Sequence, residues 1–110
     1  MKNLHVTLKK KWFDMESHPD PKLRKDEEYR EIKPYWIKRL MNLVDPDNPQ
    51  TLESWEFKDF DVYEARHGYA TDAPILKREC FEISIGKAKP EWSDNWQGNV
   101  FIIKLGDIIQ

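Results

Sequence analysis

Residues 25–32, KDEEYREI, place a lysine, a glutamate and an arginine where they could form one site. If this segment is a strand, its side chains alternate between two faces, and Glu28 and Arg30 point to the same side. A guanidinium held by a carboxylate still has N–H groups for a phosphate or a base edge. Pairing also keeps Glu28 ionised, and a desolvated glutamate near Lys25 could transfer a proton. The alternative is a structural ion pair, which contributes about 1 kcal/mol or less when exposed.

Three consecutive lysines, Lys9, Lys10 and Lys11, come where a first strand should end and a short helix begin. Cations at a helix N-terminus oppose the helix dipole, which is mildly unfavourable unless an anion binds there. The same arrangement is a natural phosphate contact. An ordinary solvated charge run explains the lysines equally well.

Aromatic side chains accompany these charges. Tyr35 and Trp36 follow the charged segment and could stack on a base. Trp36 lies on the apolar stripe of a predicted helix, so we expect it in the core and favour Tyr35 for stacking. Trp92 and Trp96 lie in a predicted loop, where packing or binding would explain them, and Glu91 is a second candidate carboxylate.

Metal and nucleotide-cradle motifs are missing from the sequence. His5, His18 and His67 have no metal-ligand spacing, and the single Cys80 cannot supply a zinc site. The four glycines form neither a P-loop nor a dinucleotide-binding fingerprint. We therefore predict no metal and no cofactor.

The totals describe one small folded domain over residues 1–110. Hydrophobic residues make up 39% and aromatic residues 13%, which argues against disorder despite 35% charged residues. The sequence has no apolar run long enough for a transmembrane helix and no signal-peptide pattern at its start. A lone cysteine suits a reducing compartment, so we predict a cytoplasmic protein without membrane contact.

Charge is distributed unevenly along the chain. The net charge is −2, but residues 1–40 hold 11 Lys and Arg against 7 Asp and Glu, or +4. The remaining residues hold 7 (18 − 11) against 13 (20 − 7), or −6. One basic face on an acidic body would attract phosphates. Lys33, Lys38 and Arg39 could extend such a face or simply point to solvent.

Hydrophobic patterning predicts the elements that would position these residues. Alternating Leu4, Val6 and Leu8 predict a first strand, and Trp12, Phe13 and either Met15 or Glu16 predict a short helix. Further elements are a strand at 25–32, an amphipathic helix at 34–44, and strands at 57–65, 73–87 and 100–109. In the segment 73–87 the apolar parity changes between Cys80 and Phe81, which predicts a bulge. The expected fold is a small α+β barrel of about five strands with two flanking helices.

In the order of these features the chain resembles an ASCH domain, a branch of the PUA-like superfamily of small mixed β-barrels. The resemblance covers nearly the whole chain, through LHVTLKKKWFDM, KPYW and PEW…VFIIKLGDI. The family's G-x-K-x-x-E-x-R signature maps to Lys25, Glu28 and Arg30. Its glycine position holds Leu23, and the longer segment SHPDPKLR replaces the short turn.

The resemblance implies a cleft between the barrel and its first two helices that holds RNA or modified nucleosides. Some relatives resemble ribonucleases, and one branch resembles amidohydrolases that act on acetylated cytidine. That branch has a threonine three residues after its lysine, where this chain has Glu28. A carboxylate is not the hydroxyl nucleophile that the branch implies, although it could act as a general base.

Three hypotheses follow. The first is a module that binds RNA or a modified nucleotide, with Lys9, Lys10, Lys11, Lys25, Arg30 and Tyr35 contacting the ligand and Glu28 orienting Arg30. The second is a small hydrolase, a ribonuclease or an acylated-nucleoside amidohydrolase, with Lys25 and Glu28 as catalytic residues and Glu91 assisting. The third is a protein-interaction domain that docks a partner on a surface of Tyr35, Trp92 and Trp96.

Overall fold

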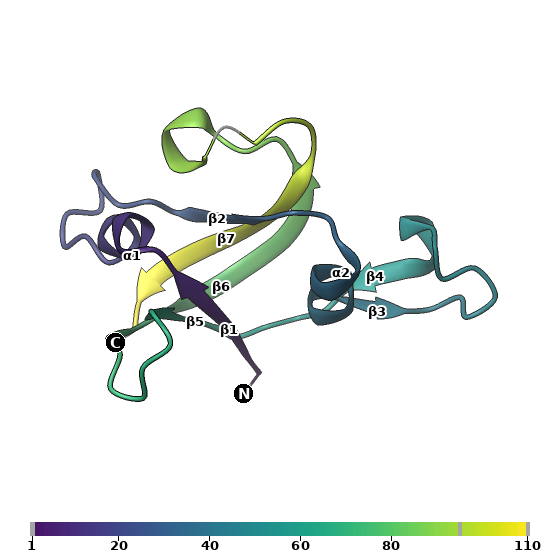
Figure 1. The fold of residues 1–110 in the computed structure, drawn as a ribbon, viewed down its shortest axis with the longest axis horizontal. Coiled ribbons are helices and arrows are strands. Elements are labelled where there is room, and N and C mark those ends of the chain that lie inside the picture. Colours follow the sequence, from purple (N-terminus) through teal and green to yellow (C-terminus); the bar gives the residue numbers. More distant parts are fainter. Residues whose placement is uncertain (1, 95, 110) are drawn as a thin grey trace.

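A five-stranded sheet curls into half a barrel and forms the body of the protein (Figure 1). The computed structural model describes residues 2–94 and 96–109, and its strand order is β1-β5-β6-β7-β2. The bounds are β1 Asn3–Leu8, β2 Glu27–Arg30, β5 Val62–His67, β6 Ile75–Gly86 and β7 Val100–Ile108. β1 runs parallel to β5, and the other neighbours pair antiparallel. The predicted α+β class is confirmed, with a sheet that closes only halfway.

β1 follows its sequence pattern. Leu4, Val6 and Leu8 are buried, whereas the intervening His5 is exposed. The three apolar side chains join one core cluster that includes Phe101 from β7. Because strand side chains alternate, burying one face of β1 fixes its register against β5.

The hairpin of β6 and β7 contains the predicted irregularity. Its pairing register shifts between Arg78 and Cys80 and again between Cys80 and Glu82. A bulge at this position is therefore confirmed, and it increases the local bend of the strand. Opposite it lies Gly106, where an added Cβ would come within 2.8 Å of a Glu79 carboxylate oxygen. The two strands can approach this closely because that position has no side chain.

Two short helices flank the sheet, α1 (Lys10–Glu16) and α2 (Pro34–Leu40). Pro34 occupies the first turn of α2, where its missing N–H costs no hydrogen bond. The prediction of a helix to residue 44 was wrong, because Met41 is already extended and begins a new strand. The residue before a proline disfavours the helical conformation, and Asp45 precedes Pro46, so a helix is not expected to continue past this point.

The segment after α2 forms a separate hairpin that projects beside that helix (Figure 1). β3 (Met41–Leu43) pairs with β4 (Trp55–Phe57), and a 3-10 turn at Leu52–Ser54 precedes β4. The single strand predicted at 57–65 is thus divided between β4 and β5. The segment between β4 and β5 is held by two backbone hydrogen bonds, from the Lys58 N–H to the Leu40 carbonyl and from the Asp61 N–H to the Lys2 carbonyl. The chain leaves the hairpin here and enters the main sheet.

β1 and β2 stand at opposite ends of the strand order, and within residues 2–94 and 96–109 no backbone ladder joins them. Two arginines bridge the gap instead. Arg30 of β2 donates to the Thr7 carbonyl at 3.2 Å, and Arg39 of α2 donates to the His5 carbonyl at 2.7 Å. This unclosed seam, defined by the free edge of β1 and the two guanidiniums, is where the main cavity lies.

None of the helices in the described part of the chain has the length and apolarity needed to cross a membrane.

Candidate functional site

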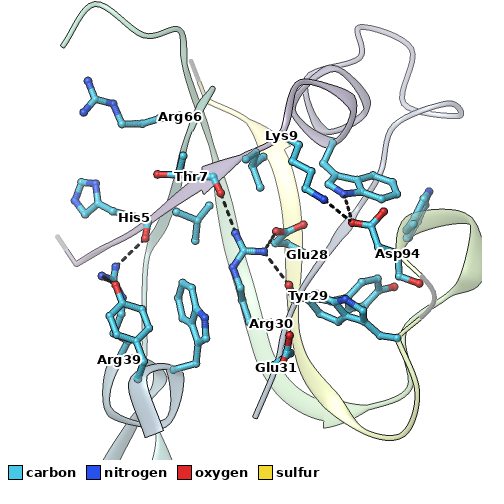
Figure 2. A pocket seen from close by; sticks show the side chains of 18 of the residues that line it. His5, Thr7, Lys9, Glu28, Tyr29, Arg30, Glu31, Arg39, Arg66 and Asp94 are labelled. Atoms are coloured by element: carbon cyan, nitrogen blue, oxygen red, sulfur yellow. Dashed lines mark hydrogen bonds and ion pairs between the residues drawn. The ribbon is translucent and has the colours of Figure 1, made fainter. Parts of the chain in front are cut away.

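A cavity of about 770 Å³ opens along the seam (Figure 2). One wall is β1, from His5 to Leu8, and another is β2 with the start of α2. The segment around Trp92, Asp94 and Trp96, which includes the 3-10 turn η2 (Pro90–Trp92), forms a third wall. Segments that are distant in sequence therefore meet around one space of the size that small ligands occupy.

The aromatic lining of the cavity is selective. Four of the five tryptophans and three of the four tyrosines of the chain line it, and none of its five phenylalanines does. The lining aromatics are Trp12, Tyr29, Tyr35, Trp36, Tyr69, Trp92 and Trp96. Tryptophan and tyrosine combine a large flat ring with a polar group, which suits a partly wet surface better than a core. The cavity thus offers several rings for stacking.

The charged lining is basic although the whole chain is acidic. Six Lys and Arg against three Asp and Glu give the cavity +3 (6 − 3), compared with −2 for the chain. The cations are Lys9, Lys25, Arg30, Lys33, Arg39 and Arg66, and the anions are Glu28, Glu31 and Asp94. Within the described residues, Arg39 and Arg66 form no ion pair with a carboxylate. The positive potential of the cavity is therefore concentrated near these two arginines.

Lys25, Glu28 and Arg30 meet at the base of the cavity. The Lys25 ammonium lies 2.6 Å from one oxygen of Glu28, and Arg30 donates to the other oxygen. β2 positions the last two, because residues two apart in a strand share a face. Glu28 is 2% exposed, whereas Arg30 is partly open to the cavity. Glu28 thus contacts both Lys25 and Arg30, and Arg30 is the member of the three that is exposed to the cavity.

Lys25 is less accessible than a phosphate contact requires. Its side chain is 1% exposed, and its ammonium also lies 3.2 Å from Glu16 and 4.4 Å from the centre of the Trp12 ring. Two carboxylates and an aromatic face surround the charge, as a buried ammonium needs. The geometry gives Lys25 a supporting position behind Glu28.

Glu16 is the fourth member of this cluster. The sequence pattern had predicted that either Met15 or Glu16 would lie with Trp12 and Phe13 on the short helix, without deciding between them. Glu16 is fully buried at the end of α1 and accepts hydrogen bonds from Lys25 and, at 2.7 Å, from the Tyr63 hydroxyl. Its spacing of four residues from the buried Trp12 was the available signal, because such residues lie on one helix face. The missing information was Tyr63, which is 47 positions away in sequence.

Glu16 and Glu28 have opposite pKa shifts although they share Lys25. Burial raises the pKa of Glu16 well above its ordinary value, and the charge of Glu28 raises it further. Burial acts in the same direction on Glu28, but the charges of Arg30 and Lys25 outweigh it and lower this pKa. Glu28 is therefore the carboxylate that carries charge toward Arg30.

Trp36 lies between two guanidiniums on the cavity wall. The Arg30 guanidinium carbon is 5.1 Å from its ring centre, and that of Arg39 is 5.3 Å from it. Trp36 also packs against the core, so it serves both as a wall and as packing. Tyr35, in contrast, is 60% exposed, and its hydroxyl accepts a hydrogen bond from Arg39 at 3.0 Å. The aromatic predicted for stacking is thus the accessible one.

The remaining predicted residues separate into two groups. Lys9 lines the cavity, where its ammonium lies 3.3 Å from Asp94, which also accepts from Trp12 (Figure 2). The structure does not bring three others, Lys10, Lys11 and Glu91, into the cavity lining. Lys10 pairs with Asp14 at 2.6 Å, the Lys11 ammonium lies 4.4 Å from the centre of the Trp12 ring, and Glu91 is exposed on η2. Lys9 is the extended residue before α1, whereas Lys10 and Lys11 begin the helix, where adjacent side chains point in different directions, so the three lysines do not face one cavity.

Trp92 and Trp96 are half-buried and pack on a second small core with Tyr29. They line the same cavity as Tyr35. Elsewhere in residues 2–94 and 96–109, no three His, Cys, Asp or Glu side chains gather as metal ligands would.

No protein-family model matches the chain, and comparisons with curated proteins and with solved structures also find no match.

Proposed function

We propose that the cavity binds single-stranded RNA or a modified nucleotide, and that the chain is a PUA-like barrel of the ASCH type acting in the cytoplasm. The observation that carries the proposal is the lining itself. Most of the tryptophans and tyrosines and a +3 charge converge on one space in a chain of charge −2. Flat rings for bases and cations for phosphates are the two requirements of single-strand binding.

Arg30 is the central contact in this proposal. It already donates to Glu28 and to the carbonyls of Tyr29 and Thr7, and other N–H groups of its guanidinium remain for a ligand. Glu28 and Lys25 act through it by fixing its orientation. Tyr35 provides an exposed ring, and Arg39 and Arg66 provide unneutralised charge for phosphates.

The hydrolase alternative has less support. Its lysine and glutamate are buried against each other, and Glu91, its third residue, lies outside the cavity. One observation favours it. Carboxyl groups whose pKa values are pushed apart are typical of acid–base catalysis, and Glu16 and Glu28 behave in this way. Glu16 is fully buried, however, and would need a relay to reach a substrate.

Binding is tested by titrating the protein with an oligouridylate at low and moderate salt, with tryptophan fluorescence as the signal. We expect saturable quenching that weakens as salt increases. Tyr35→Ala should reduce affinity by about fivefold to about a hundredfold, the range for loss of one stacked base. Phe81→Ala removes another exposed aromatic, outside the cavity, and should leave binding unchanged.

The Arg30→Lys variant tests whether binding needs the planar guanidinium of Arg30 or only its positive charge. It retains a cation for Glu28 but removes the planar fork, so affinity should fall while the fold remains. Absence of binding at low salt, or equal affinity of wild type and Arg30→Lys, contradicts the proposal. Conversion of an RNA panel or of acetylated cytidine to products, lost in a Lys25→Met variant that circular dichroism shows to be still folded, would establish the hydrolase instead.

A further inference from the structure

A second hollow, about 400 Å³ in volume, adjoins the main cavity across Arg39, which lines both. Its walls come from the start of β1, the end of α2, β3 and the segment before β5. The lining residues are Lys2, Asn3, Leu4, Lys38, Arg39, Asn42, Lys58 and Phe60. Half of these residues are cations, and none is an aspartate or glutamate.

The four cations of this hollow are not neutralised by neighbours. Among the described residues, no carboxylate lies within ion-pair distance of the side chains of Lys2, Lys38, Arg39 or Lys58. Lys2 does contact a carboxylate through its backbone, because its N–H donates to Asp61 at 3.0 Å. Four like charges around one depression repel one another, and an anion placed between them would relieve that repulsion.

Stabilisation of the helix end accounts for only part of this charge. Lys38 and Arg39 are in the last turn of α2, where cations complement the helix dipole. Lys58 donates to the Lys38 carbonyl at 3.0 Å, but an ammonium has further N–H groups. Within residues 2–94 and 96–109, the Lys2 side chain makes no ion pair, and it belongs to neither α2 nor its end. The excess of charge points to a ligand.

Arg39 connects the two spaces. Its guanidinium is fixed by one hydrogen bond to the His5 carbonyl and one to the Tyr35 hydroxyl, at the end of the aromatic cavity (Figure 2). The hollow beyond it has Phe60 but no tryptophan or tyrosine. The main cavity is thus suited to bases with phosphates, and the hollow to phosphates alone.

We propose that the hollow is a backbone subsite that holds a phosphate of the nucleotides next to those in the cavity. The physiological ligand is then a single strand that passes over Arg39, and an isolated mononucleotide fills only part of the surface. This inference rests on the proposed function of the cavity and adds the length of its ligand. It also predicts that affinity depends on residues outside the cavity.

The test measures the affinity of a uridine dinucleotide and of a uridine octanucleotide for the wild-type protein and for a Lys38→Gln/Lys58→Gln variant. Glutamine at 58 retains a donor for the Lys38 carbonyl, so the end of α2 is preserved. The variant should bind the octanucleotide about tenfold or more weakly at low salt, and its salt slope should fall by about 1.4, or 0.7 for each of two lost contacts. Binding of the dinucleotide should not change.

Lys22→Gln/Lys87→Gln is the matched control, because both lysines are exposed and neither lines the cavity or the hollow. It should retain the octanucleotide affinity and salt slope of the wild type. If the octanucleotide binds no more tightly than the dinucleotide, or equally to both double variants, the subsite is refuted while binding in the cavity stands. If neither oligonucleotide binds, the proposed function fails as well.

Discussion

The charges behind the cavity and the charges on its rim obey different constraints. Behind it, Lys25 and Glu16 are almost completely buried, and the Lys25 ammonium contacts the carboxyl groups of both Glu16 and Glu28. On the rim, Arg39 and Arg66 form no ion pair with a carboxylate in the described part of the chain. Burial makes an unpaired charge very costly, so the inner group must neutralise itself, whereas water allows the outer group to stay charged. We therefore expect the first group to determine stability and the second to attract the proposed ligand.

Arg78 shows that a buried, paired charge also occurs in this fold away from the cavity. It is 1% exposed and is held by Asp26 and by the carbonyls of Glu16, Lys25 and Gly106. It joins α1, the start of β2 and β7 at one end of the half-barrel without reaching the cavity lining. Arg78, a buried cation with hydrogen bonds from all three of its guanidinium nitrogens, is thus a structural element, and accessibility distinguishes the residues proposed to bind.

Removing the inner cation should produce the largest effect. Lys25→Met leaves Glu16 and Glu28 buried together without their shared partner, so the free energy of unfolding should fall by about 3–5 kcal/mol. Urea unfolding followed by fluorescence measures it. Lys22→Met, in an exposed loop, should change the same quantity by no more than about 0.5 kcal/mol. Similar losses in the two variants would remove the distinction between buried and exposed lysines.

The pH dependence of stability should reveal the opposite pKa shifts within the inner group. The folded state raises the pKa of Glu16, so above the ordinary value of 4.5 the native chain holds a proton that the unfolded chain has lost. Stability from Glu16 then declines as pH increases, until the raised pKa is passed. Glu28 has a lowered pKa, so its contribution is complete above 4.5 and is lost as pH falls below that value.

Glu16→Gln mimics the protonated acid and should flatten the decline above about pH 5 in urea unfolding midpoints. Asp14→Asn changes an exposed carboxylate on the same helix and should retain the decline. If stability declines with pH in Glu16→Gln as it does in the wild type, another titrating group is responsible for the decline.

The smallest effect is expected on the rim. Arg66 donates to the Thr71 carbonyl at 3.3 Å, and its Nε is buried without a partner, so the fold gains little from its guanidinium. Arg66→Gln should change stability by no more than about 0.5 kcal/mol. It should reduce the salt slope of octanucleotide binding by about 0.7, the value for one phosphate contact. A loss of stability without a loss of affinity would place Arg66 in the inner group.

Local periodicity predicted the parts of this site that lie in one strand. The alternation in residues 3–8 identified β1, and the spacing of Glu28 and Arg30 placed them on one face. The change of parity at Cys80 located the bulge. These features depend on neighbours two positions apart, which the sequence displays directly.

Long-range contacts account for what periodicity could not predict. Glu16 is buried because Lys25 and Tyr63 meet it from elsewhere in the chain. Arg66 lines the cavity because β5 pairs beside β1. The hairpin of β3 and β4 replaced the end of a predicted helix, since pairing with a distant segment outweighed the local apolar pattern. No single segment of the sequence contains this information.

The seam has one more consequence, which concerns copies of the chain. A bare strand edge exposes a row of backbone groups on which another strand can assemble. On β1 the His5 and Thr7 carbonyls are occupied by Arg39 and Arg30, whose bulk and charge obstruct an incoming strand. The half-open barrel can thus keep its cavity without offering a template for aggregation. The same arginines that are proposed to contact a ligand also obstruct pairing of the chain with itself.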